Sequence, residues 1–220
     1  MYCPKTLVVC NTGLYTALGT GVRSFPYSIH TQTGYITQID SRMAEPMRER
    51  DRAPVYNIVT WNVRGLGTKR KQRRVLAYLQ RQNTHIAFLQ ETHMTKERLD
   101  SLGRSWRGRL IGTVTSSFAR GVLIWVSSNT PYIATSHTVN PDGRYVVIEG
   151  SLDGTPLALV AIYAPNFGQN IFLDKITPAL LQDPHVPIIW GGDFNSVLDI
   201  DMDRSHPPVP GQCASALLNL

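Results

Sequence analysis

The chain has 220 residues, of which 42% are hydrophobic, 17% charged and 9% aromatic. This length and composition fit a globular domain with a sizeable core, and they exclude a wholly disordered, collagen-like or coiled-coil chain. No apolar run approaches the roughly 20 residues of a membrane-spanning helix, and no clear secretory signal stands near the N-terminus. We therefore expect an intracellular protein, nuclear or cytoplasmic, with no membrane partner.

The positive charge of the chain is concentrated in one segment. Lys and Arg number 22 against 16 Asp and Glu, which gives a net charge of +6 and a pI near 9.4. Residues 53–90 contain no acidic residue and carry Arg64, Lys69, Arg70, Lys71, Arg73, Arg74 and Arg81. This pattern predicts either a phosphate-facing patch or an ordinary solvated helix face. The 3 cysteines lack metal-ligand spacing and indicate a reducing compartment without a disulfide framework.

The first segment of the chain, residues 1–53, is rich in Thr, Gly, Ser and Tyr and shows no sustained helical or strand period. We expect it to be poorly ordered, and we assign it no function. The domain is expected to occupy residues 54–220.

From Pro54 onward, strand-like runs alternate with amphipathic segments. Strands are expected at 55–61, 85–90, 110–115, 121–127, 145–151, 157–163 and 186–190, and helices at 69–82, 95–102 and 170–182. The pair Asp153-Gly154 predicts a hairpin. This mixture of strand–helix–strand units and hairpins predicts an α/β domain with mixed sheets and outer helices.

Polar groups stand at the far ends of four apolar strands, in the segments 60–62, 89–93, 162–166 and 192–195. The carboxyl ends of strands in α/β sheets are where ligands bind, so these ends are expected to meet in one cleft. The cleft would hold two carboxylates, several amides and a phenol, and such oxygen ligands suit Mg²⁺ and phosphate. Gly191-Gly192 is expected to form a turn after the last strand.

Several motifs resemble the endonuclease/exonuclease/phosphatase superfamily. They are WNVRGL, FLQETH, RGVLIWV, DGRYVVIEG, IYAPN, IIWGGDFN and the later Asp203-Arg204-Ser205. Among its members, QETH, IYAPN, GDFN and DRS are most similar to the endonuclease domain of LINE-type non-LTR retrotransposons. The related apurinic/apyrimidinic repair endonucleases usually have QETK where this chain has QETH. The resemblance covers residues 54–208 and does not include residues 1–53.

The resemblance implies a four-layered α/β sandwich, in which two mixed β-sheets are flanked by helices. It also implies a DNA endonuclease that nicks by Mg²⁺-dependent phosphodiester hydrolysis, with Mn²⁺ as an alternative metal. In a full-length relative, a reverse transcriptase domain would accompany the endonuclease. A phosphatase of the same superfamily and a non-catalytic nucleic-acid-binding fragment remain alternatives.

The same resemblance implies a role for individual residues. Glu91 would be the main metal ligand with Asn62 beside it, and Asp193 would orient or deprotonate the attacking water. Asn195 would hold the phosphate and the Asp193 carboxylate, and Tyr163 would donate a hydrogen bond to a phosphate oxygen. DNA contacts would come from Asn166, Arg204 and His93. Trp61 and Phe194 are expected to pack in the core.

The match has one gap near the end of the chain. The superfamily domain continues past GDFN to a Ser-Asp-His motif, whereas the last histidine here is His206, in the sequence Ser-His-Pro-Pro. We therefore expect a C-terminally truncated domain with an incomplete sandwich and weak or no nicking activity.

Overall fold

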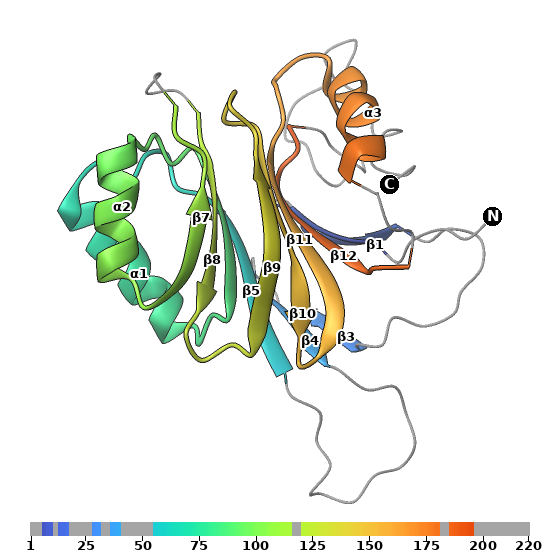
Figure 1. The fold of residues 1–220 in the computed structure, drawn as a ribbon, viewed down its shortest axis with the longest axis horizontal. Helices are drawn as coiled ribbons and strands as arrows, with labels where there is room; N and C mark the ends of the chain where they lie inside the picture. Colours follow the sequence, from blue (N-terminus) through green and yellow to red (C-terminus); the bar gives the residue numbers. More distant parts are fainter. Residues whose placement is uncertain are drawn as a thin grey trace, which may run out of the picture.

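Two β-sheets lie face to face, and helices cover their outer sides (Figure 1). The computed structural model describes the backbone of residues 6–10, 13–17, 28–31, 36–40, 55–115, 120–180 and 185–195, and side chains for residues 55–115, 120–177 and 185–195. Within the described residues, no helix combines the length and the apolar character needed to cross a membrane.

Each sheet has six strands in the part of the chain that the structure describes. Sheet A has the order β2 (Gly13–Ala17), β1 (Thr6–Cys10), β12 (Ile188–Asp193), β11 (Thr155–Tyr163), β10 (Tyr145–Leu152) and β9 (Tyr132–Val139). Sheet B has the order β3 (Ser28–Thr31), β4 (Ile36–Asp40), β5 (Val55–Asn62), β6 (Ile86–Gln90), β8 (Val122–Ser127) and β7 (Gly108–Gly112). Both sheets mix parallel and antiparallel pairs, as the sequence predicts.

Helices α1 (Lys69–Arg81) and α2 (Lys96–Ser105) cover the outer face of sheet B. Threonines stand at both N-caps, where each hydroxyl accepts a hydrogen bond from a backbone N–H of the first turn. Val75 and Leu79 of α1 are buried against this sheet, as the expected helical spacing of apolar residues requires. Helix α3 (Gln169–Leu180) covers sheet A with Leu173 and Ile176.

Three apolar clusters separate these layers. One lies between the two sheets, one lies between sheet A and α3, and one lies between sheet B and the pair α1 and α2. The predicted four-layered α/β sandwich is therefore confirmed. Phe194 is buried in the cluster beneath α3, whereas Trp61 is only half-buried at the margin of the cluster beneath α1.

The Gly191-Gly192 pair belongs to strand β12, so the prediction of a turn at this pair is wrong. A Cβ on Gly191 would stand 2.2 Å from a ring carbon of Phe88 in sheet B. A Cβ on Gly192 would stand 2.2 Å from the carbonyl oxygen of Ile162 in β11. The two glycines let β12 approach both the opposite sheet and its own neighbour, and the strand continues to Asp193.

Strands β1 to β4 come from residues 1–53, where the sequence analysis assigned no element. β1 pairs with β12 in sheet A, and β4 pairs with β5 in sheet B. Each of these strands has only four or five residues, too few for a strand period to stand out from the surrounding polar residues.

Strand β9 was also not predicted. It is one of the two edge strands of sheet A in the described structure, and most of its side chains are exposed. It therefore lacks the alternation of buried and exposed residues on which strand prediction depends.

Candidate active site

The predicted site residues meet where the two sheets end together. β5 and β6 run parallel in sheet B and end at Asn62 and Gln90, immediately before Glu91. β11 and β12 run parallel in sheet A and place Tyr163 opposite Asp193 in the strand register. Because both parallel pairs present their carboxyl ends on the same side, one amide and one carboxylate from sheet B face one phenol and one carboxylate from sheet A.

Asn62 joins the two carboxylates. Its Nδ2 donates to Glu91 Oε1 at 2.8 Å and to Asp193 Oδ2 at 3.1 Å. Its Oδ1 accepts the backbone N–H of Arg64 at 3.1 Å, which fixes the orientation of the amide. The Tyr163 hydroxyl donates to the same Glu91 oxygen at 3.1 Å. Four of the predicted residues thus form one hydrogen-bonded cluster, and Glu91 is its common acceptor.

The backbone at Glu91 is held in an unusual conformation. Its φ is +52°, in the left-handed region that residues other than glycine rarely adopt. The neighbouring residues fix it from both sides, because Val63 N–H donates to Gln90 O and Thr92 N–H donates to Gly121 O. Arg64, His93 and Asn195, which also lie in loops at this end of the sheets, have positive φ as well. Strain of this kind persists where the surrounding structure over-determines it, and it is often found at functional sites.

Asn195 supports Asp193 through its backbone. Its N–H donates to Asp193 Oδ1 at 3.1 Å, so the two oxygens of this carboxylate are held by different residues. The Asn195 side chain donates instead to the carbonyl oxygen of Ala164 at 2.7 Å. The backbone N–H of Asn195, and not its side chain, therefore contacts the Asp193 carboxylate.

Tyr163 is fixed by Arg144, which was not among the predicted site residues. Arg144 Nη1 donates to the carbonyl oxygens of Tyr163 and Ala164, both at 3.2 Å, and its guanidinium carbon lies 5.2 Å from the centre of the Tyr163 ring. Burial raises the pKa of the Tyr163 phenol, and the charge of Glu91 acts in the same direction. The phenol therefore stays protonated near neutral pH and remains a hydrogen-bond donor.

Two of the predicted DNA-contacting residues, Asn166 and His93, lie in loops near this cluster. Asn166 is exposed, and its carbonyl oxygen accepts from Gln169 Nε2 at 2.7 Å. The same Gln169 amide donates to Asn195 O at 2.8 Å, so this buried side chain joins two loops of the site. His93 packs beside Gly65. A Cβ added at Gly65 would lie 3.2 Å from Nδ1 of His93. Arg204 lies outside the described residues.

Arg144 and Gln169 were missed because their partners are backbone carbonyls in distant segments. Arg144 does stand within the motif DGRYVVIEG, which was the one available signal for it.

The donor atoms of the cluster fit a hard divalent cation. Glu91 and Asp193 supply carboxylate oxygens, which are ligands that Mg²⁺ prefers. Within the described residues the one ion pair is Lys96 with Asp100, so neither carboxylate has a cationic side chain as partner. The described residues contain no cluster of three or more His, Cys, Asp or Glu able to hold a metal, so a metal here would rest on these two carboxylates and neutral oxygens.

A cavity of about 710 Å³ opens beside the cluster. Asn62 and Asp193 line one part of it, and Trp61, Lys71 and Tyr78 line another. β4 pairs with β5 only as far as Val59, so in the described structure residues 60–62 have an open edge on this side. The cavity therefore leads from Asn62 and Asp193 toward helix α1.

The sequence of the chain is similar to part of a transposon protein. A chain of the African clawed frog Xenopus laevis described as "Transposon TX1 uncharacterized 149 kDa protein" is 29% identical over 168 residues, which are 74% of this chain and 13% of that protein. This chain therefore spans only a small part of that relative.

Two solved structures were matched to the chain, and the first of them is similar to it in fold. The AP endonuclease LMAP from Leishmania major has a TM-score of 0.53 and 20% identity, over 76% of this chain and 63% of that one. The endonuclease domain of TRAS1, a telomere-specific non-LTR retrotransposon, has a TM-score of 0.48 and 18% identity, over 66% of this chain and 62% of that one.

The family comparison covers most of the chain. Residues 59–211 match the sequence profile of the Endonuclease/Exonuclease/phosphatase family, whose members are phosphodiester hydrolases and whose nucleases generally use divalent metal ions. The matched segment runs from β5 past β12 and includes every residue of the cluster that Asn62 joins. The chain therefore belongs to the Endonuclease/Exonuclease/phosphatase family.

Proposed function

We propose that this protein is a DNA endonuclease of the retrotransposon type, which nicks one strand by Mg²⁺-dependent hydrolysis of a phosphodiester. The observation that carries the proposal is the meeting of Glu91 and Asp193, from opposite sheets, on the single amide of Asn62. The similarity to a transposon protein supports DNA as the substrate, and the basic surface of helix α1 supports a polyanion as the partner.

Each residue of the cluster has a role that its position supports. Glu91 would be the main ligand of the metal, with Asn62 beside it. When bound, the metal supplies stabilisation of the charge that develops on the phosphoryl oxygens and on the leaving group. Asp193 accepts a proton from the attacking water or orients it, since its carboxylate is held by hydrogen bonds to both oxygens.

The remaining residues would bind and position the DNA. The protonated Tyr163 phenol can donate a hydrogen bond to a phosphate oxygen, which is the fixed donor that an anionic transition state requires. Arg144 holds the Tyr163 backbone in place. Asn195, Asn166, His93 and Arg204 are proposed to contact the phosphate or the DNA backbone.

Nicking of supercoiled plasmid by the purified chain, with Mg²⁺ and with EDTA, tests this proposal. Glu91→Gln and Asp193→Asn should each lower the Mg²⁺-dependent rate by about 100-fold or more, since each removes a member of a cooperating set. Glu97→Gln on α2 and Asp174→Asn on α3 are the matched controls, because both carboxylates are exposed and lie on helices outside the cluster.

Metal binding is measured separately, so that a slow reaction does not hide the site. Electron paramagnetic resonance measures the binding of Mn²⁺. The affinity for Mn²⁺ should be weakened by Glu91→Gln and unchanged in Glu97→Gln. Equal binding and equal nicking in both variants would contradict the proposal. Turnover of soluble phosphate monoesters without nicking would point to a phosphatase of the same family.

A further inference from the structure

The charges of helix α1 are arranged against the stability of the helix. Its first turn carries Lys69, Arg70 and Lys71 and contains no acidic residue, although the positive end of the helix dipole lies there. Arg70 and Arg74 are like charges four residues apart, which also destabilises a helix. None of these cations forms an ion pair within the described residues. A solvated helix face with mixed charges would have none of these costs, and a polyanionic partner would offset them.

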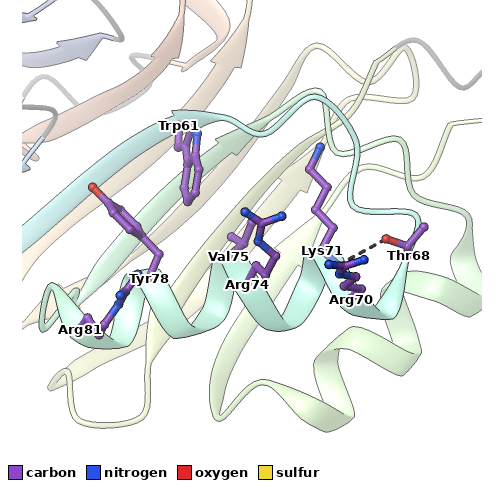
Figure 2. Close-up of a pocket in the computed structure, with 8 residues that line it drawn as sticks. All are labelled: Trp61, Thr68, Arg70, Lys71, Arg74, Val75, Tyr78 and Arg81. Carbon is purple, nitrogen blue, oxygen red and sulfur yellow. Dashed lines mark hydrogen bonds between the residues drawn. The ribbon is translucent and has the colours of Figure 1, made fainter.

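One line of side chains on α1 faces strand β5. Lys71, Arg74, Tyr78 and Arg81 follow one another at steps of three or four residues, so they lie along one side of the helix over about 15 Å. Figure 2 shows Lys71, Arg74 and Tyr78 pointing to the side of the helix on which Trp61 of β5 lies. These residues line a cavity of about 650 Å³.

The cavity contains an aromatic pair. The rings of Trp61 and Tyr78 are 4.9 Å apart between centres and inclined by 59°, and both side chains are half-buried. The other tryptophans of the chain, Trp106, Trp125 and Trp190, are at most 3% exposed, so Trp61 is the accessible one. Base stacking on aromatic rings combined with a basic groove is the usual way in which proteins hold single-stranded nucleic acid.

This groove is continuous with the proposed active site. The cavity along α1 and the cavity beside Asn62 and Asp193 share Trp61, Lys71 and Tyr78 as lining residues. A strand that occupied the groove would therefore extend toward Asn62 and Asp193.

We propose that the groove between α1 and β5 binds a single-stranded segment of DNA, with its phosphates on Lys71, Arg74 and Arg81 and a base stacked on Trp61. Binding in the groove stands on the groove residues alone. Its continuity with the cleaved strand rests on the function proposed above.

Binding of a short labelled oligonucleotide by the full chain in EDTA, over a range of NaCl concentrations, tests the groove without cleavage. Lys71→Gln, Arg74→Gln and Arg81→Gln combined should reduce the slope of log affinity against log salt by about 2 and the affinity at 0.1 M salt by about 100-fold. The matched control combines Arg73→Gln, Arg104→Gln and Arg107→Gln, which are exposed, do not line this cavity and remove the same charge. Equal losses in the two triple variants would overturn the proposal.

Tryptophan fluorescence tests the stacking contact. A single-stranded oligonucleotide should quench the emission of the wild-type chain, and Trp61→Leu should remove this response and weaken binding roughly tenfold. Duplex DNA of the same length should bind more weakly than the single strand. Equal affinity for the two forms with unchanged fluorescence, or tighter binding of the corresponding RNA, would overturn the proposal.

The groove and the active site are separated by a further variant. Glu91→Gln should retain oligonucleotide binding in EDTA, since it leaves every groove residue in place. A chain that binds the oligonucleotide as expected but neither binds Mn²⁺ through Glu91 nor nicks in Mg²⁺ would refute the proposed function and leave the groove standing. A chain that nicks while the groove triple variant binds and nicks normally would refute the groove alone.

Discussion

The side-chain nitrogen of Asn62 lies 2.8 Å from Glu91 Oε1 and 3.1 Å from Asp193 Oδ2, so one amide group satisfies a carboxylate from each sheet. Asn62 and Glu91 come from sheet B, whereas Asp193 comes from sheet A. This amide therefore holds together the two halves of the proposed metal site.

Replacing Asn62 by aspartate removes both donated hydrogen bonds and adds a third negative charge. We expect Asn62→Asp to lower the free energy of unfolding in EDTA by about 2 kcal/mol, which corresponds to a fall in Tm of roughly 5 °C. Added Mg²⁺ should restore more of this loss than it adds to the wild type. Asn129→Asp, at an exposed position, is the control. An unchanged Tm in EDTA would contradict a bridging role for Asn62.

The left-handed backbone at Glu91 predicts a difference in stability between two variants that both lack the carboxylate. Asparagine adopts this conformation more readily than alanine does, so Glu91→Asn should be more stable than Glu91→Ala by about 1 kcal/mol. Both variants should lose metal binding, because both lack the carboxylate. Urea unfolding of the pair measures the difference, and an Ala variant as stable as the Asn variant would show that the conformation carries no strain.

The close approach of the sheets at Gly191 predicts a large effect from one methyl group. A Cβ there would meet the Phe88 ring at 2.2 Å, so Gly191→Ala should lower the free energy of unfolding by about 3 kcal/mol through overpacking. Gly103→Ala on α2, where nothing lies within 4 Å of the added atom, should instead be neutral or stabilising. If the Phe88 contact is the cause, Phe88→Leu should reduce the penalty of Gly191→Ala.

His85 predicts a loss of stability in mild acid. Burial lowers the pKa of its imidazole, and its Nδ1 accepts the backbone N–H of Asn57 at 2.9 Å, which requires that this nitrogen be unprotonated. The unfolded chain then binds a proton more readily than the folded chain below the ordinary histidine pKa of about 6.5. Stability from this group is complete above that pH and is lost as the pH falls below it.

Thermal melts of wild type and His85→Gln between pH 7 and pH 5 measure this effect. The wild-type Tm should fall more steeply over this range, because glutamine does not titrate there. Parallel curves for the two proteins would mean that His85 does not contribute to the acid sensitivity.

The layers of the fold and the composition of the site could be predicted from the sequence. Parallel strands end at the same edge of a sheet, so polar residues at the ends of paired strands, such as Asn62 with Glu91 or Tyr163 with Asp193, can be placed together from their order alone. The meeting of Glu91 with Asp193 across the two sheets is an expectation that the family resemblance supports. The hydrogen-bond pattern could not be predicted in this way. Which atom of Asn62 faces the carboxylates depends on the backbone N–H of Arg64, which donates to Asn62 Oδ1, and no sequence pattern reveals this contact.

Other elements were missed for different physical reasons. Strands β1 to β4 are short, and β9 lies at a sheet edge with mostly exposed side chains, so pairing with distant strands determines them more than local pattern does. Arg144 acts on the carbonyl groups of Tyr163 and Ala164, which are not adjacent to it in the sequence. Hydrogen bonds to backbone atoms leave no spacing rule that sequence analysis could use.

The division of the site between two sheets also determines when it forms during folding. Sheet B comprises strands from residues 28–127, whereas sheet A joins residues 6–17 to residues 132–193. A partly folded chain in which only one of the two sheets has formed would hold Glu91 or Asp193 in place without the other. Helix α1, by contrast, forms from neighbouring residues in sequence. Under the proposed function, a newly made chain would acquire its affinity for DNA before its ability to cut it.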